Sequence, residues 1–503
     1  MLAFLLPVNS RPAFFAHCKM YHFGIFALRH RLFASIQPLY SSTFFQTMPS
    51  MPPIAAPPTT LRLPDFYETS LQNGIKLITV EDDAQPLLTM SIVSRNGAAE
   101  DEIWGETNFM TSLMNKGTTK RNAQTLADEI DFTGGSLSAS CVFDSLSSSL
   151  SVLSDFTEQG LELLADMTLR PSFPGEEIER VRQQTLVEID QANNDAGYLS
   201  SIALTQGLFK GQKYGHPVIG TQDIVRGLGQ SHCRTAYERS FQPKDVFIAA
   251  AGKFRTDELR DRLNTHFAEW TSHAPSPIPN EQQPDEQLSP VSAQATKIML
   301  IEKPDAAQTS LRVGFLTAGR HDVDFIPMQM LNTIFGGSFI SRLNHNLREE
   351  KGYTYGVHSS VDSRKYASSL TVGTHVGSEV VENAVSEILR EIELLRTEPV
   401  SDEELETTRK YIIGSFALRT ETPTQVVSLA STLELYGLPK DYHAGYLARL
   451  ATISKEELFA VQQRRFSTQN LVIAAAGTVE FLREKLQQFG AVSVVDANGK
   501  VFA

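Results

Sequence analysis

The sequence predicts an α+β protein made of two similar domains in tandem, each built from strands and helices. Three observations carry this prediction: the length of the chain, an internal repeat, and an interleaved pattern of strand and helix signals. The chain has 503 residues, whereas a single hydrophobic core stops growing near about 250–300 residues. Hydrophobic residues make up 41% and charged residues 20% of the chain, as in a soluble globular protein.

The strongest of these signals is the internal repeat. The segment Phe241–Gly252 returns as Phe466–Gly477, 225 residues later. In both copies an apolar run that ends in glycine predicts a buried strand followed by a turn. A second pair, Pro174–Arg182 and Val400–Arg409, lies at an offset of 227 residues. Two matches in the same order and at nearly the same offset indicate that one domain is present twice.

The first copy contains strand and helix signals in alternation. The hairpin signal Asn73-Gly74 precedes the first expected strand. At 137–143 apolar residues alternate with Ser and Asp, which is typical of a half-buried strand. Strands are expected at 75–81, 87–93 and 137–143, and helices at about 104–115 and 123–132. Interleaved elements of this kind predict an α/β or α+β domain.

These patterns divide the chain into four segments. An extension at 1–64 precedes a first domain at 65–271, and a second domain covers 291–503. Between them, 272–290 is rich in Pro, Gln, Asn and Glu, which favours a linker.

The extension bears on the compartment of the protein. No Asp or Glu precedes Asp65, while Arg and Lys are spread among Phe, Leu and Ser. This composition resembles an organellar transit peptide, and a mitochondrial matrix location would then follow. Alternatively Met48 or Met51 is the true first residue, in which case a cytoplasmic location is favoured.

Charge and hydropathy limit the partners. The net charge of −13 argues against nucleic acid and leaves basic peptides open. No run of eighteen apolar residues occurs in the sequence, so no membrane-spanning helix is expected.

Two halves of about 220 residues joined by a linker resemble the pitrilysin/insulinase family of zinc peptidases, which includes subunits of mitochondrial processing peptidase. The resemblance covers nearly everything from Asp65 to the C-terminus and implies a pitrilysin-like roll, an antiparallel-rich sheet flanked by helices, in each half. The family landmarks stand here as Leu71-Gln-Asn-Gly74, Lys116-Gly-Thr118, Gly134-Gly135, Tyr214-Gly-His-Pro217 with Gly220-Thr221, and Gly336-Gly-Ser-Phe-Ile-Ser-Arg-Leu343.

The zinc motif of this family is missing. Active members carry H-x-x-E-H before Lys-Gly-Thr, with two His that bind zinc and a Glu that activates water. Here Asn108 and Ser112 occupy the His positions and Thr111 the Glu position. Asn and Ser are poor zinc ligands, and Thr cannot act as a general base. Glu188 matches the third ligand, but Val181 replaces its usual supporting acid. We therefore expect no metal site and no catalytic residue in this chain alone.

A second family element is retained. Leu347–Gly356 looks like the Arg/Tyr element of active members, in which both side chains reach the zinc site from the second half and contact the substrate. Arg348 and Tyr355 match those positions. Arg offers a forked cation and Tyr a hydroxyl that can donate to an oxyanion. The alternative is that Arg348 pairs with an acid such as Glu349 or Glu350 and that Tyr355 packs in the core.

The combination favours a non-catalytic, zinc-less subunit of a heterodimeric pitrilysin-family metallopeptidase. Such a subunit binds peptide substrates and complements a partner that carries the zinc. The α subunit of mitochondrial processing peptidase fits less well, because Gly336-Gly337 leads directly into Ser-Phe without a long Gly-rich loop. Two alternatives stay open: a structural homologue like the core subunits of respiratory complex III, and an active metalloendopeptidase with an unrecognised metal site.

Overall fold

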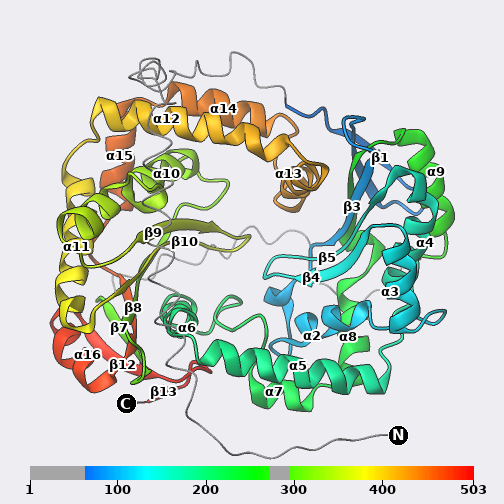
Figure 1. The fold of residues 1–503 in the computed structure, drawn as a ribbon. Coiled ribbons are helices and arrows are strands. Elements are labelled where there is room, and N and C mark those ends of the chain that lie inside the picture. Colours follow the sequence, from blue (N-terminus) through cyan, green and yellow to red (C-terminus); the bar gives the residue numbers. More distant parts are fainter. Residues whose placement is uncertain (1–62, 272–294, 503) are drawn as a thin grey trace, which may run out of the picture. The chain divides into compact units, whose positions relative to one another are not determined.

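The computed structural model describes residues 63–271 and 295–502. Nearly all of the predicted extension and the whole predicted linker lie outside these ranges. The described residues belong to one compact unit, in which they form two open, mostly antiparallel sheets flanked by helices (Figure 1). The predicted fold class is therefore confirmed.

Each half contributes one sheet. The six-stranded sheet has the order β1-β2-β6-β3-β5-β4, and the seven-stranded sheet has the order β13-β12-β7-β11-β8-β10-β9. The strands of the first are β1 (Tyr67–Ser70), β2 (Lys76–Glu81), β3 (Leu87–Ser94), β4 (Ser136–Cys141), β5 (Leu146–Leu153) and β6 (Val246–Gly252). Those of the second are β7 (Lys297–Glu302), β8 (Thr309–Thr317), β9 (Val357–Ser363), β10 (Ser368–Val376), β11 (Val472–Gly477), β12 (Ala491–Val495) and β13 (Val501–Phe502).

The sequence repeat is also a repeat of topology. The order β2-β6-β3-β5-β4 of the first sheet recurs as β7-β11-β8-β10-β9 in the second. The two copies of the repeated apolar run form β6 and β11, and both strands are buried along their whole length. β6 pairs in parallel with β2 and antiparallel with β3, and β11 pairs in the same way with β7 and β8. The predicted buried strands are confirmed.

Helices flank both sheets, and those expected at about 104–115 and 123–132 are among them. In the first half they are α2 (Glu106–Met114), α3 (Ala123–Phe132), α4 (Thr157–Leu169), α5 (Gly175–Asn193), α6 (Ala196–Phe209), α7 (Gln222–Gly227), α8 (Gln230–Ser240) and α9 (Thr256–His266). In the second half they are α10 (Phe325–Asn332), α11 (Val381–Thr397), α12 (Asp402–Ala417), α13 (Pro423–Leu435), α14 (Tyr442–Thr452), α15 (Lys455–Arg465) and α16 (Val479–Leu486). Among the described helices, none is long and apolar enough to cross a membrane.

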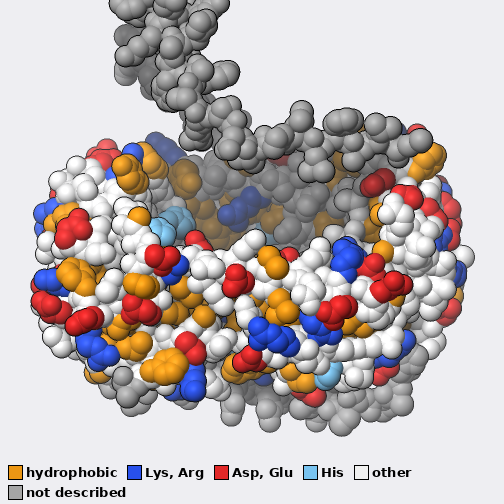
Figure 2. Space-filling model, turned by 60° about the horizontal axis from the view of Figure 1, so that its bottom comes forward, with side chains coloured by type: hydrophobic (Ala, Val, Ile, Leu, Met, Phe, Trp, Pro, Cys, Tyr) orange, Lys and Arg blue, Asp and Glu red, His pale blue; other side chains and the backbone are white. Residues whose placement is uncertain are grey.

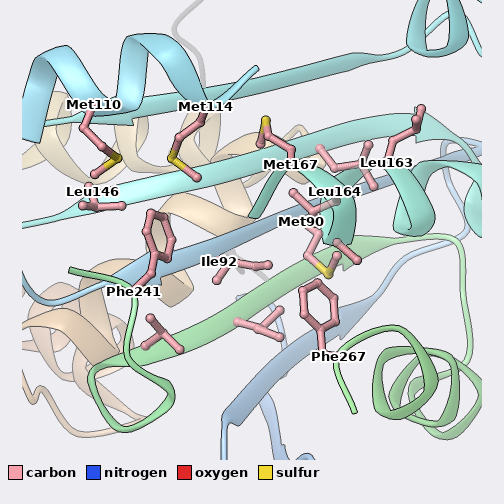
Figure 3. Packing of buried hydrophobic residues seen from close by; sticks show 14 of the residues in the cluster. Met90, Ile92, Met110, Met114, Leu146, Leu163, Leu164, Met167, Phe241 and Phe267 are labelled. Atoms are coloured by element: carbon pink, nitrogen blue, oxygen red, sulfur yellow. The ribbon is translucent and has the colours of Figure 1, made fainter. Parts of the chain in front are cut away.

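One face of the first sheet carries the core of the first half. Met90 and Ile92 of β3 are fully buried there. Figure 3 shows them beside Met167 of α4 and, farther along the sheet, Met110 and Met114 of α2. This packing fixes the position of α2, the helix that carries the degenerate zinc motif.

The other face of each sheet is covered by a helix from the other half. α6 of the first half packs on β8 and β11 of the second sheet, and α13 of the second half packs on β3 and β6 of the first (Figure 1). The Ser200 and Ser310 hydroxyls, 2.9 Å apart, join α6 to β8. Ala430 of α13 belongs to a buried cluster with Phe247 and Ala249 of β6. The two halves thus share hydrophobic clusters on both sheets.

Charged side chains of both signs are interspersed over the face shown in Figure 2, among apolar ones. Elsewhere, Glu434 at the end of α13 joins the two halves through ion pairs with Lys76 and Arg95 of the first half. The face in Figure 2 therefore does not carry the continuous basic surface that binding to a nucleic acid backbone requires.

Candidate functional site

The three degenerate motif positions lie on α2, as the spacing to Lys-Gly-Thr predicts. The Thr111 hydroxyl is buried and donates to the Thr107 and Asn108 carbonyls, at 3.1 and 2.9 Å. The Ser112 hydroxyl is exposed and donates to the Asn108 carbonyl at 3.0 Å. Both hydroxyl groups are engaged by the backbone of their own helix. The three motif positions therefore offer zinc no imidazole or carboxylate and offer water no base.

The other two positions of the family's zinc site lie on α5, which packs beside α2. Glu188 is exposed and Val181 is buried in the first core. Among the described residues, no group of three or more His, Cys, Asp or Glu side chains could hold a metal ion. The residues present do not fit zinc.

The Lys116-Gly-Thr118 landmark, which follows α2 in the chain, has a structural role. The Thr118 hydroxyl donates to Oδ2 of Asp166 at 2.6 Å. Asp166 is fully buried in α4 and also accepts from Arg121 and Arg170, both at 3.0 Å. Burial alone would raise the pKa of Asp166, but these hydrogen bonds outweigh it and hold the pKa below its ordinary value. A charged carboxylate therefore ties α4 to the segment after α2.

Arg348 lies in a short π-helix, Asn344–Glu350, and has no acidic partner among the described residues. Its guanidinium lies 4.3 Å from the ring centre of Phe339, which is 66% exposed. Glu349 and Glu350 instead lie 3.3 and 3.4 Å from the two nitrogens of His345. The alternative in which Arg348 pairs with a neighbouring acid is wrong.

Tyr355 is 94% exposed. The alternative in which it packs in the core is therefore also wrong. Tyr355 and Phe339 line a pocket of about 570 Å³, whose lining residues all belong to the second half. Tyr355 is thus a large aromatic side chain at the edge of a pocket, with its hydroxyl free to meet another molecule. A role for Arg348 and Tyr355 in substrate binding stays a prediction.

The floor of this pocket contains three polar residues that the sequence analysis did not single out: Arg312, His358 and His375. They lie on β8, β9 and β10, and Gly373 of β10 pairs with both Arg312 and His358. The Arg312 side chain donates to the Gly197 carbonyl of α6 at 3.2 and 3.3 Å. Burial lowers the pKa of Arg312. Polar residues alternate with apolar ones along β9 and β10, and this pattern could have indicated a sheet face that no apolar layer covers.

We expect the purified chain to contain no stoichiometric zinc. Neither Asn108, Thr111 nor Ser112 can replace a histidine or glutamate, so treatment with a strong chelator should leave the melting temperature unchanged. Elemental analysis and thermal unfolding check this, with an H-x-x-E-H-bearing peptidase as the positive control. Tightly bound zinc at one ion per chain would contradict the assignment.

Two family models match the sequence, one within the first half and one that runs from the end of the first half into the second. Residues 78–222 match the model described as insulinase (peptidase family M16), and residues 231–412 match the peptidase M16 inactive domain. Together they span more than half of the chain. An uncharacterized zinc protease, YmxG of Bacillus subtilis, is 23% identical over 72% of this chain and 87% of its own length. A non-peptidase homolog, YmxG of Helicobacter pylori, is 20% identical over 77% of this chain and 88% of its own.

Solved structures have the same fold. A peptidase M16 inactive domain from Pseudomonas fluorescens superposes with a TM-score of 0.75 at 22% identity, over 82% of this chain and 98% of that one. A chain of Complex III2 from Candida albicans superposes with a TM-score of 0.68 at 15% identity, over 84% of this chain and 99% of that one. With its two matched domains, its repeated sheets and its family landmarks, the chain belongs to peptidase family M16, the insulinase family.

Proposed function

We propose that this chain is the zinc-less subunit of a two-chain M16 peptidase, which binds peptides and completes the active site of a zinc-bearing partner. One observation carries the proposal. Arg348 and Tyr355 are both without an internal hydrogen-bond or ion-pair partner among the described residues, although the zinc motif of the same chain has been replaced. Side chains kept only for stability would pack or pair within the chain.

Arg348 and Tyr355 can assist a reaction for which another chain supplies the zinc and the water. An arginine fork can hold a peptide carbonyl or carboxylate through two hydrogen bonds, and a tyrosine hydroxyl can donate to an oxygen on which negative charge develops. Zinc in the partner would supply the activated water. In this chain Arg348 and Tyr355 would bind and orient the scissile peptide.

The pocket beside Tyr355 supports the peptide part of the proposal. Its floor offers ring nitrogens from His358 and His375 and hydroxyls from Ser360 and Thr371, all on β9 and β10. Extended peptides carry a donor and an acceptor at every residue, so a polar surface along two strands is suited to them. The acidic net charge of the chain favours basic peptides over acidic ones.

A second candidate is a structural subunit without any role in hydrolysis. Its support is the shared fold with a chain of Complex III2 from Candida albicans. It predicts a stable multi-subunit assembly in which no H-x-x-E-H-bearing chain contacts this one.

The test is to purify the protein from its own cells under mild conditions and to identify the chains that accompany it. The proposal expects one M16 chain with an intact H-x-x-E-H motif. Mixing the two purified chains should then give peptide hydrolysis that neither gives alone. A stable assembly without such a chain, or a zinc-bearing partner that is fully active alone, would overturn the proposal.

A further inference from the structure

The second half contains another cavity, which lies mainly between its helices. It has a volume of about 450 Å³, within the range of small-molecule sites. Its walls come from α10, the end of α12 with the short helix Leu418–Thr420, α13, α14 and β9. None of its lining residues lines the pocket of Tyr355, so the two cavities are separate.

Two arginines without acidic partners line this cavity. Neither Arg320 nor Arg419 has a carboxylate within ion-pair distance among the described residues, and no Asp or Glu lines the cavity. One guanidinium nitrogen of Arg320 donates to the Ser363 carbonyl at 3.2 Å, while its Nε is buried without a hydrogen-bond partner. The Arg320 guanidinium also lies 4.2 Å from the ring centre of Tyr436 and 5.5 Å from that of Phe325, but no carboxylate among the described residues balances its charge. The cavity is therefore suited to an anion.

Aromatic rings form the wall beside these cations. The rings of Tyr442 and Tyr446 are stacked at 6.3 Å with an interplanar angle of 26°, and Phe416 lies 5.8 Å from the ring of His443. The Arg419 guanidinium lies 5.9 Å from the ring centre of Phe416. Such walls bind flat apolar groups by offset or edge-to-face packing. The cavity thus combines two cationic side chains with an aromatic surface.

His443 gives an independent indication of a ligand. It is only 6% exposed, it lines the cavity, and its Nε2 has no hydrogen-bond partner in the described chain. Burial lowers the pKa of His443, despite a backbone hydrogen bond at Leu429, and the positive charge of Arg419 lowers it further. The ring is therefore neutral at neutral pH, and a bound molecule can satisfy Nε2 by a hydrogen bond. Buried polar atoms are rarely left without partners.

The internal repeat relates this cavity to the degenerate zinc site of the first half. α10 follows the strand β8 as α2 follows β3, and α12 begins in the repeat segment that also begins α5. α13 corresponds in the same way to α6. The cavity thus lies among the counterparts of the helices that carry the degenerate zinc positions in the first half.

We propose that this cavity binds a small organic anion with an aromatic body. Arg320 and Arg419 hold the anionic group, the rings of Phe416, Tyr442 and Tyr446 pack against the aromatic body, and His443 Nε2 forms a hydrogen bond to the ligand. The proposal does not depend on a peptidase partner, because every group in it belongs to this chain.

The probe for this chemistry is 1-anilinonaphthalene-8-sulfonate, which carries a sulfonate on two aromatic systems. Its uncharged counterpart, N-phenyl-1-naphthylamine, has the same rings without the anion. Equilibrium dialysis against the full chain should give one saturable sulfonate site, with the uncharged compound bound at least about tenfold more weakly, because a charge-assisted hydrogen bond is worth about 1.5–3 kcal/mol.

The matched variants are Arg419→Gln and Arg483→Gln. Both arginines are exposed and form no ion pair with a described residue, but only Arg419 lines the cavity. Arg419→Gln should weaken binding of the sulfonate about tenfold, and Arg483→Gln should leave it unchanged, with equal melting temperatures as the check on folding. Equal affinity of Arg419→Gln and the unmodified chain, equal binding of the uncharged compound, or no saturable site would overturn the proposal.

Discussion

Arg348→Ala lowers the turnover number of the reconstituted two-chain peptidase by about 100- to 1,000-fold, the loss typical of removing one donor to a developing oxyanion. The physical reason is that the Arg348 guanidinium has no partner in the described part of the chain apart from the ring of Phe339, so its hydrogen bonds are available to the substrate. The measurement is kcat and KM for a fluorogenic peptide, with both chains present at equal concentration.

The control for this substitution is Arg390→Ala. Arg390 is an exposed arginine of α11 that forms an ion pair with Glu387 of the same helix. Its replacement should leave both kinetic constants unchanged. Tyr355→Phe removes a single hydroxyl and keeps the exposed ring, and it should also lower kcat. Normal hydrolysis by the Arg348→Ala complex, with the two chains still associated, would exclude a role in the reaction.

Asp166→Ala destabilises the chain by about 3–5 kcal/mol, the loss expected when one partner of a buried charged network is removed. Thr118, Arg121 and Arg170 all direct donors at the fully buried Asp166 carboxylate, and the substitution leaves these donors without an acceptor. The measurement is the midpoint of urea unfolding. Glu162→Ala, which removes the exposed partner of the same Arg121, should cost less than about 1 kcal/mol. Equal effects of the two substitutions would contradict this assignment.

The same carboxylate gives the stability a pH dependence. The pKa of Asp166 is lowered in the folded state from its ordinary value of 3.8. Its contribution to stability is therefore fully present above pH 3.8 and is lost as the pH falls below that value towards the folded pKa. The difference in stability between the unmodified chain and Asp166→Asn should accordingly shrink in acid.

Much of the fold was predictable because its signals are local. The apolar runs that end at Gly252 and Gly477 became the central strands β6 and β11. The helix expected at 123–132 is α3, whose N-cap Asn122 accepts from the Thr125 amide. In each case the pattern within about ten residues already determines the element.

The features that were missed depend on contacts between distant segments. Neither α6 nor α13 was predicted from the sequence, and no local pattern shows that each covers the sheet of the other half. Similarly, Arg320 and Arg419 are ordinary arginines in sequence, and only the fold brings them together around His443 in a cavity without carboxylates. The sequence resemblance identified Arg348 and Tyr355, whereas only the structure excludes their pairing or packing within the chain.

The most direct test of the central claim is a titration of the purified zinc-bearing partner with this chain, in which peptide hydrolysis and bound zinc are measured together. The account predicts that hydrolysis rises from near zero and saturates at one copy of each chain, with one zinc ion per pair and none on this chain alone. Zinc bound by the isolated chain together with peptide cleavage in the absence of a partner would contradict it.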